Sequence, residues 1–331
     1  MSFDKKKRDR IKKYLLDKIA AGNTDYVNRT VNAFGITTTS VYRYLKEFES
    51  EGILEKKGSK YELKTILKKV VLLRSKGELK DEESIYVKYI KGDLAGKKEN
   101  VRRIWGYAFT EMMNNAIDHS EAEEVTLLIY ENYVNTFMII YDNGVGIFKK
   151  IKDYFNLDSL EDAAKELFKG KFTTDSKRHS GEGIFFTSRM MDVFGIVSDG
   201  IIFSHEKYDE VVNARTESKG TTILMGLSEN SRRKTREVFD KYADTEEGFT
   251  KTSIKIKNIF EEYPVSRSQA KRLVNGLEKF VTVELDFSGI DEIGQGFADE
   301  LFRVFTNAHP EITLTPVNMC SDVEKMYRHV K

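Results

Sequence analysis

The sequence has very few residues that could form disulfides or metal centres built from cysteine and histidine. Its 331 residues include one cysteine, Cys320, which excludes an internal disulfide and a zinc site built from several cysteines. We expect Cys320 to be a small packed residue, the commonest role of a free thiol. The five histidines are scattered and lack the spacing of metal ligands.

Long apolar runs are also missing. No stretch is long enough to span a bilayer, and no apolar segment of the kind found in signal peptides follows the Lys/Arg-rich first residues. We therefore expect a cytoplasmic protein that does not contact a membrane. A length of 331 residues predicts two or three domains.

Net charge is small but unevenly distributed. Residues 1–64 contain fifteen Lys or Arg and nine Asp or Glu, a local charge of +6, and since the whole chain carries +1 the remainder carries −5. A basic segment on a mildly acidic body indicates nucleic-acid binding at the N-terminus.

The basic segment is expected to contain three helices and a hairpin. We predict helices at 5–20 and 25–33, a third that starts at Thr37–Ser40 and ends at Gly52, and two strands around the lysines at 56–60. This order resembles a winged helix-turn-helix, whose recognition helix enters the major groove of double-stranded DNA. The resemblance implies that DNA is contacted by Thr38, Thr39, Ser40, Tyr42, Arg43 and the hairpin residue Lys57. A winged helix that binds protein is the alternative; the basic excess favours DNA.

The stretch 107–120, YAFTEMMNNAIDHS, organises the middle of the chain. Glu111, Asn115 and Asp118 are spaced i, i+4 and i+7, which places them on one stripe of a helix. A neighbouring apolar stripe can face a core; it consists of Val101, Trp105, Ala108, Met112 and Ala116. Taken alone, this pattern fits either a site or an ordinary charged helix edge.

Three further motifs follow in order. Asp142-Asn-Gly144-Val-Gly146 comes after an apolar run, Gly181-Glu-Gly183 opens a helical stretch, and Gly220-Thr221 leads into a strand. Together with the helix motif, they resemble the GHKL (Bergerat-fold) ATP-binding family, which includes DNA gyrase, MutL proteins, sensor histidine kinases and anti-sigma-factor serine kinases. The resemblance implies ATP and Mg²⁺ as ligands.

Each matched residue then has an expected role. Asp142 accepts a hydrogen bond from the adenine amino group, Thr221 makes the second adenine contact, and Gly144 and Gly146 let the backbone approach the base. Asn115 offers an amide oxygen to Mg²⁺. The glycines Gly181 and Gly183 precede a helix whose amides hold phosphate oxygens.

The polar segment 149–180 resembles the family's ATP lid, and its lysines, including Lys177, are candidates for phosphate contacts or for solvated charges. By resemblance, Glu111 is the general base. Asp118 is either a direct ligand or a structural residue. A histidine kinase is rejected because no phospho-acceptor hairpin of that type is present.

The last 83 residues alternate strands and helices. The stretch 281–288 resembles STAS domains, and Phe297-Ala-Asp-Glu-Leu resembles a STAS-like variant often joined to GHKL modules. The turn at 294–296 is Gly-Gln-Gly, without a hydroxyl, and Ser288 lies earlier, so self-phosphorylation there is not expected. We expect this domain to dock a protein partner or to dimerise.

The predicted fold is multidomain α+β, with a winged helix at 1–64, a connector at 65–99, a GHKL α/β sandwich at 100–228, a linker at 229–248 and a STAS-like domain at 249–331. Within it we predict helices at 65–74, 81–91, 101–118 and 184–194, and strands at 124–131, 135–141, 196–204, 209–214 and 221–227. In the last domain we predict strands at 250–257, 281–287 and 311–317, and helices at 266–280, 294–307 and 321–330.

Three functions are compatible with these motifs. The first is an ATP-responsive, DNA-binding regulator that acts as a homodimer, since two-fold DNA sites usually pair with dimers. The second is a serine/threonine protein kinase that acts on a partner. The third is a scaffold that binds ATP without turnover. Whether the chain is an ATPase or a kinase stays open at this point.

Overall fold

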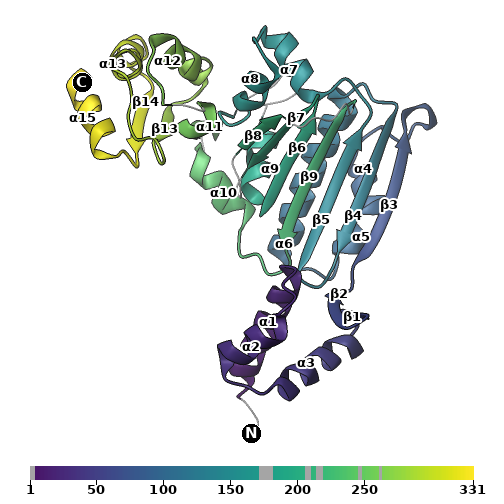
Figure 1. Cartoon of the computed structure of the whole chain (residues 1–331). Coiled ribbons are helices and arrows are strands. Elements are labelled where there is room, and N and C mark those ends of the chain that lie inside the picture. The colour runs from purple at the N-terminus through teal and green to yellow at the C-terminus, as the bar shows by residue number, and fades with distance from the viewer. Residues whose placement is uncertain (1–3, 171–181, 206–209, 214–218, 245–247, 261–262) are drawn as a thin grey trace. The chain divides into compact units, whose positions relative to one another are not determined.

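The computed structural model describes residues 4–170, 182–205, 210–213, 219–244, 248–260 and 263–331 (Figure 1). The chain is multidomain and mixes helices with strands, in agreement with the predicted α+β class. It divides into two compact units. The first comprises Met1–Val70, Leu127–Ile139 and Gly226–Ser231, and the second comprises Val71–Thr126, Ile140–Met225 and Arg232–Lys331.

The N-terminal part of the first unit contains three helices and a hairpin, as predicted. These are α1 (Lys5–Ala20), α2 (Tyr26–Phe34), α3 (Thr38–Ser50), β1 (Leu54–Lys57) and β2 (Lys60–Leu63). Thr37 caps α3 by accepting a hydrogen bond from the Ser40 amide. Apolar side chains from all three helices and the hairpin form one core, which includes Leu15, Tyr26, Leu45 and Leu54.

A seven-stranded sheet forms the middle of the chain, with the strand order β3-β4-β5-β9-β6-β7-β8. Its strands are β3 (Ile66–Leu73), β4 (Glu124–Glu131), β5 (Asn135–Asp142), β6 (Val193–Ser198), β7 (Ile201–His205), β8 (Glu210–Asn213) and β9 (Thr221–Ser228). β6, β7 and β8 pair antiparallel. The predictions for β4, β5 and β9 are confirmed within one residue.

Helices of the second unit pack together on one face of the sheet (Figure 1). The long helix α6 (Glu99–His119) contacts α4 (Glu82–Tyr89) on one side and α9 (Gly183–Met190) on the other. The short elements η1 (Arg74–Lys76) and α5 (Lys91–Leu94) complete this region. The predicted helix at 101–118 is therefore confirmed, with two extra residues at its start and one at its end.

Several predicted elements were wrong. The segment 65–74, predicted as a helix, is the edge strand β3, where Ile66, Val70 and Val71 favour extended backbone. The helix predicted at 184–194 ends at Met190, and the residues from Val193 onward form β6. The strand at 196–204 is a hairpin, because residues 199–200 turn the chain with positive φ at both positions.

The segment predicted to be an interrupted lid begins with two helices, α7 (Ile147–Phe155) and α8 (Leu160–Glu166). Asn156 ends α7 in the left-handed conformation, and Ser159 caps α8. Residues 171–180 of this segment lie outside the described part of the chain. The segment predicted as a linker contains α10 (Thr235–Tyr242), followed by β10 (Ala243–Asp244) and β11 (Gly248–Phe249).

The C-terminal region has the predicted alternation, built on the parallel sheet β12-β13-β14. Its elements are β12 (Lys251–Lys255), α11 (Ile256–Ile259), α12 (Arg267–Val274), η2 (Leu277–Lys279), β13 (Thr282–Asp286), α13 (Gln295–Asp299), the π-helical turn η3 (Glu300–Phe305), α14 (Thr306–Ala308), β14 (Thr313–Val317) and α15 (Ser321–Val330). The predicted helix at 266–280 breaks at Gly276, whose φ is +81°. Among the described residues, no helix has the length and apolar character needed to cross a membrane.

Candidate functional site

Helix α6 carries the first group of predicted site residues on one stripe. Glu111 and Asn115 are half-buried, while Asp118, near the end of the helix, is exposed. The neighbouring stripe is fully buried: Trp105 and Ala108 have no exposed surface, and Met112 is 1% exposed. The helix is therefore anchored through its apolar side, which fixes the direction of the polar stripe.

Asp142 ends strand β5 and is buried, with 4% of its surface exposed. Its carboxylate accepts hydrogen bonds from the Gly144 amide at 2.9 Å and from the Thr221 amide at 3.3 Å. Burial raises the pKa of Asp142 above its ordinary value, and these two hydrogen bonds oppose the rise. A carboxylate is thus held in a fixed direction at the end of a strand.

Two glycines allow this turn to form. A side chain at Gly144 would place its Cβ 2.0 Å from the Ser120 carbonyl oxygen, at the end of α6. The Val145 amide donates to that same oxygen at 2.8 Å. Gly220 has a φ of +82°, and a Cβ there would lie 1.9 Å from the Asp142 carbonyl oxygen. Backbone is therefore packed against backbone on both sides of Asp142.

Thr221 and two residues that the sequence analysis missed complete this cluster. The Ile147 amide lies 3.1 Å from the hydroxyls of both Ser198 and Thr221, which accept from it. Asp199 accepts from the Lys149 amide at 3.1 Å, and a Cβ on Gly146 would lie 2.4 Å from its carboxylate. The Asp199-Gly200 dipeptide is a turn signal that could have indicated this corner.

Glu111 lies against the first residue of α9. A Cβ on Gly183 would come within 2.2 Å of Glu111 Oε2, so only glycine leaves room for the carboxylate in its present position. Tyr107, one turn before Glu111, has its pKa raised mainly by burial, with further contributions from the charges of Glu111 and Glu182. The Tyr107 phenol therefore interacts electrostatically with the carboxylates of Glu111 and Glu182, near the contact of α6 with α9.

The structure brings two subsets of the predicted site residues together. The first joins Asp142, Gly144, Gly146 and Thr221, and the second joins Glu111 and Gly183. The turn that follows Asp142 rests on the end of α6, the helix that carries Glu111, Asn115 and Asp118. The predicted phosphate residues Lys177 and Gly181 lie outside the described part of the chain.

The predicted DNA-contact residues lie on α3 and the hairpin. Thr38, Thr39, Tyr42 and Arg43 are exposed at the start of α3, while Ser40 is half-buried, with its hydroxyl 3.0 Å from that of Thr37. The hairpin lysine behaves differently. Lys57 is paired with Glu55 at 3.0 Å and Glu62 at 3.1 Å, and both carboxylates raise its pKa.

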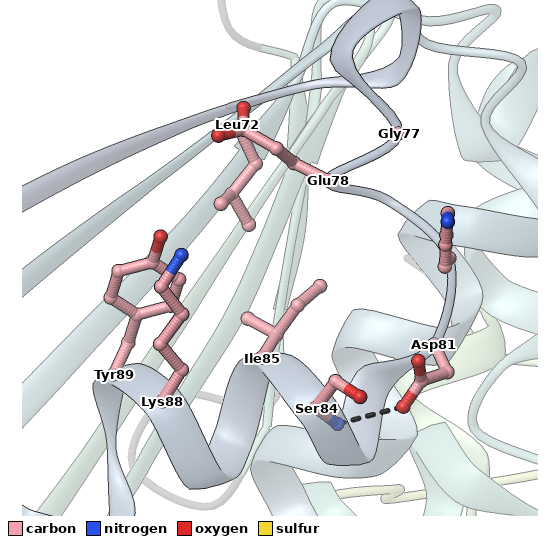
Figure 2. Close-up of a pocket in the computed structure, with 9 residues that line it drawn as sticks. Leu72, Gly77, Glu78, Asp81, Ser84, Ile85, Lys88 and Tyr89 are labelled. Carbon is pink, nitrogen blue, oxygen red and sulfur yellow. Dashed lines mark hydrogen bonds between the residues drawn. The ribbon is translucent and has the colours of Figure 1, made fainter.

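A pocket of about 230 Å³ lies between the end of β3 and helix α4, apart from the residues predicted from the motifs (Figure 2). Figure 2 shows Ile85 and Leu72 beside the polar side chains of Tyr89 and Lys88, and the Ser84 amide bound to Asp81 at 2.7 Å. Its volume is below the roughly 300–1,000 Å³ usual for small-molecule sites. The pocket therefore does not compete with the Asp142 cluster as the candidate site.

Comparison with known proteins identifies one region. Residues 269–324, which extend from α12 into α15, match a family described as a STAS-like domain of unknown function (DUF4325). A search among curated proteins found no match. The predicted STAS-like character of the C-terminal region is thereby supported over these residues.

Proposed function

We propose that this chain binds ATP with Mg²⁺ through a GHKL-type site and that bound nucleotide controls the binding of double-stranded DNA by an N-terminal winged helix. The observation that carries the proposal is the Asp142 cluster. Four motif residues separated by up to 79 positions in sequence, Asp142, Gly144, Gly146 and Thr221, meet at the end of one strand. Two backbone contacts there tolerate only glycine.

The cluster suits adenine recognition. Asp142 is held by two backbone amides, which leaves carboxylate lone pairs that can accept from the adenine amino group. The space that side chains at Gly144 and Gly146 would occupy is filled by Ser120 and Asp199, so these glycines let the turn pack closely beside the proposed base site. In this proposal the Thr221 hydroxyl makes the second base contact. Ser198 and Asp199 stabilise the turn by accepting hydrogen bonds from the amides of Ile147 and Lys149.

Mg²⁺ would be held by Asn115, whose neutral amide oxygen is a suitable hard ligand. The described residues contain no group of three or more His, Cys, Asp or Glu side chains placed to hold a metal ion. The coordination shell would therefore be completed mainly by phosphate oxygens and water, as is usual for Mg²⁺. When bound, the ion offsets the charge of the triphosphate.

Glu111 is the proposed general base. It lies four residues before Asn115 on the same stripe of α6 and touches the start of α9. Its role would be to orient a water molecule or an acceptor hydroxyl toward the γ-phosphate, and a positioned base contributes roughly 10²–10⁴ in rate. Asp118 is more exposed, which favours a role at the rim over direct contact with the base.

DNA binding is proposed for α3 and the basic segment that contains it. Exposed Thr38, Thr39 and Arg43 occupy the first turns of the helix, the part that contacts base edges in helix-turn-helix proteins. Residues 1–64 carry a charge of +6, which suits a phosphate backbone. Because Lys57 is already paired with two glutamates, we assign it a smaller share of phosphate binding.

Calorimetry tests the nucleotide site. We expect wild type to bind ATP in the presence of Mg²⁺, Asp142→Ala to lose binding, and Asn115→Ala to lose the dependence on Mg²⁺. Gly92→Ala is a matched control, since a Cβ there meets no atom within 4 Å. Duplex DNA affinity is then measured with and without ATP. Unchanged DNA affinity and oligomeric state would contradict the coupling.

A second candidate is a serine/threonine kinase acting on a partner protein, since the resemblance of the chain to GHKL modules joined to a STAS-like domain suggests a circuit of the anti-sigma type. Transfer of labelled γ-phosphate to a co-purified protein, lost in Glu111→Ala, would support it, whereas release of free phosphate alone would count against it. Equal, slow hydrolysis by wild type and Glu111→Ala would instead indicate a scaffold that binds ATP without turnover.

A further inference from the structure

A buried lysine connects the region of the candidate site with the STAS-like segment. Lys169 is 3% exposed and pairs with Glu166 at 2.7 Å. Its Nζ also donates to the carbonyl oxygens of Arg272 at 2.9 Å and Asn275 at 3.2 Å, at the end of α12. The three hydrogens of the ammonium group thus have three acceptors. Thr252 donates to the Lys169 carbonyl oxygen at 2.7 Å, so the backbone is held too.

The residue after Lys169 is packed between two phenylalanines. A Cβ on Gly170, whose φ is +81°, would lie 2.6 Å from Phe185 and 3.0 Å from Phe249. Phe249 contacts Phe185, with ring centroids 4.5 Å apart, and Phe280 at 5.3 Å. Phe280 belongs to the segment that matches the STAS-like family. Lys169 and Gly170 therefore join α9 to this segment by polar and by aromatic contacts.

The first turn of helix α9 contacts both Glu111 and Phe249, the phenylalanine that packs on the STAS-like segment. Its first residue, Gly183, touches the Glu111 carboxylate, and Phe185 and Phe186 pack on Phe249 at 4.5 and 4.9 Å. A helix of eight residues moves as one body, because its backbone hydrogen bonds tie successive turns together. A shift of the STAS-like segment that moves Phe249 would therefore move Gly183 against Glu111.

We propose that Lys169 is a positioning residue through which the STAS-like domain sets the place of α9 and, with it, the place of Glu111. This inference rests on the proposed function for its catalytic consequence, but the mechanical link from α12 to α9 stands on the contacts alone. A protein partner that binds the STAS-like domain and displaces α12 would change turnover without touching nucleotide.

The buried pair makes this connection sensitive to substitution. Burial raises the pKa of Glu166, and the charge of Lys169 opposes the rise. Removing the ammonium leaves a buried carboxylate and two helix-end carbonyl groups without their donor, which strongly disfavours the present packing. Lys169→Met is therefore the direct test, and Lys169→Met/Glu166→Gln removes the unpaired charge in case the single variant does not fold.

The full chain is compared as wild type, Lys169→Met, the double variant and Lys271→Met. Lys271 lies on the same helix, α12, but its side chain is 68% exposed, so it controls for loss of a lysine there. Hydrogen exchange of the α9 amides is measured without nucleotide, and ATP binding and phosphate release are measured with Mg²⁺. We expect faster α9 exchange and about 10-fold slower turnover in both Lys169 variants. We expect ATP affinity within about twofold of wild type, because the Asp142 cluster is untouched.

The inference is overturned if the α9 amides of the Lys169 variants exchange at the wild-type rate. It is also overturned if the double variant turns over ATP at the wild-type rate. A fall in ATP affinity that matches the fall in turnover also overturns it, because the lysine would then act on binding and not on Glu111. If wild type neither binds nor hydrolyses ATP while α9 exchange still responds to Lys169→Met, the proposed function fails and the link between the domains stands.

Discussion

Gly183→Ala separates the catalytic role that we propose for Glu111 from the stability of the fold. The added Cβ would lie 2.2 Å from Glu111 Oε2 and 3.1 Å from its Cδ. Non-bonded heavy atoms settle at about 3.5–4.0 Å, so the carboxylate must move by about 1 Å or more. The atom in the way is the tip of a flexible side chain, and the clash can therefore be relieved by rotation of Glu111.

The opposing energies are small and nearly cancel. Alanine is more favourable than glycine by about 0.8–1.0 kcal/mol inside a helix, and less at its first position, which Gly183 occupies in α9. An off-rotamer Glu111 costs about 0.5–1.5 kcal/mol. We therefore expect unfolding free energy to change by less than about 1 kcal/mol. A displacement of about 1 Å at a catalytic group costs about 10²-fold in rate.

Urea unfolding and ATP-dependent phosphate release are measured on the same preparations. Gly106→Ala is the matched control: it lies on α6, the helix that carries Glu111, and a Cβ there would make an ordinary 3.4 Å contact with the Tyr86 hydroxyl. We expect the control to keep wild-type turnover. Wild-type turnover in Gly183→Ala, with Glu111→Ala inactive, would refute the placement of Glu111 against α9.

Three further predictions concern other parts of the site. Gly220→Ala should lower unfolding free energy by at least about 1–2 kcal/mol in urea titrations, because its Cβ meets backbone and its φ is +82°. The raised pKa of Asp142 stabilises the fold below the ordinary value of 3.8, and this contribution is lost as pH rises through the raised value. Asp142→Asn lacks this pH-dependent contribution, so its unfolding free energy minus that of wild type should increase as pH rises through this window. A difference in unfolding free energy that does not change with pH would contradict the prediction. Arg43→Ala should weaken duplex binding in anisotropy titrations and flatten its salt dependence, and Lys57→Ala much less, because Lys57 is paired with Glu55 and Glu62.

Local sequence patterns were sufficient for elements whose structure is determined locally. Helix α1, the capped start of α3 at Thr37 and the alternation of strands and helices after Lys251 all follow the predicted order. Apolar periodicity and caps act within a few residues, so they are visible in a single sequence. The helix α6 was predicted for the same reason, since its apolar stripe runs along its whole length.

Elements that depend on distant pairing were not predictable in this way. The run Ile66–Leu73 has apolar pairs at a spacing that also suits a helix, and its strand conformation is decided by its place beside β4, more than fifty residues later. The hairpin of β6 and β7 was missed because the Asp199-Gly200 turn was read as part of one apolar run. Tertiary context overrides propensity at both places.

The candidate site shows the same division. Motif order predicted that Asp142, its glycines and Thr221 belong to one site, and the structure brings these residues together. Ser198 and Asp199 contact the turn from about fifty residues away; the Asp199-Gly200 dipeptide signals a turn in its own segment but not which distant residues that turn contacts. The role of Lys169 is not visible in the sequence either: a lysine in a charged stretch is normally solvated, yet besides its pairing with Glu166 it donates to carbonyl oxygens at the end of α12, more than a hundred residues away.

The burial of Asp142 favours the binding role that we propose for the cluster. Its carboxylate is 4% exposed and its pKa is raised, so ionisation at neutral pH disfavours the folded state. A strand end needs no carboxylate, and an amide in the same place could accept from Gly144 and Thr221 without that penalty. A carboxylate is favoured over an amide at this position if a bound ligand donates a hydrogen bond to it. Groups held at such a disadvantage concentrate at functional sites. Asp142, more than any exposed charge on α6, is therefore the residue whose substitution tests the proposed nucleotide binding.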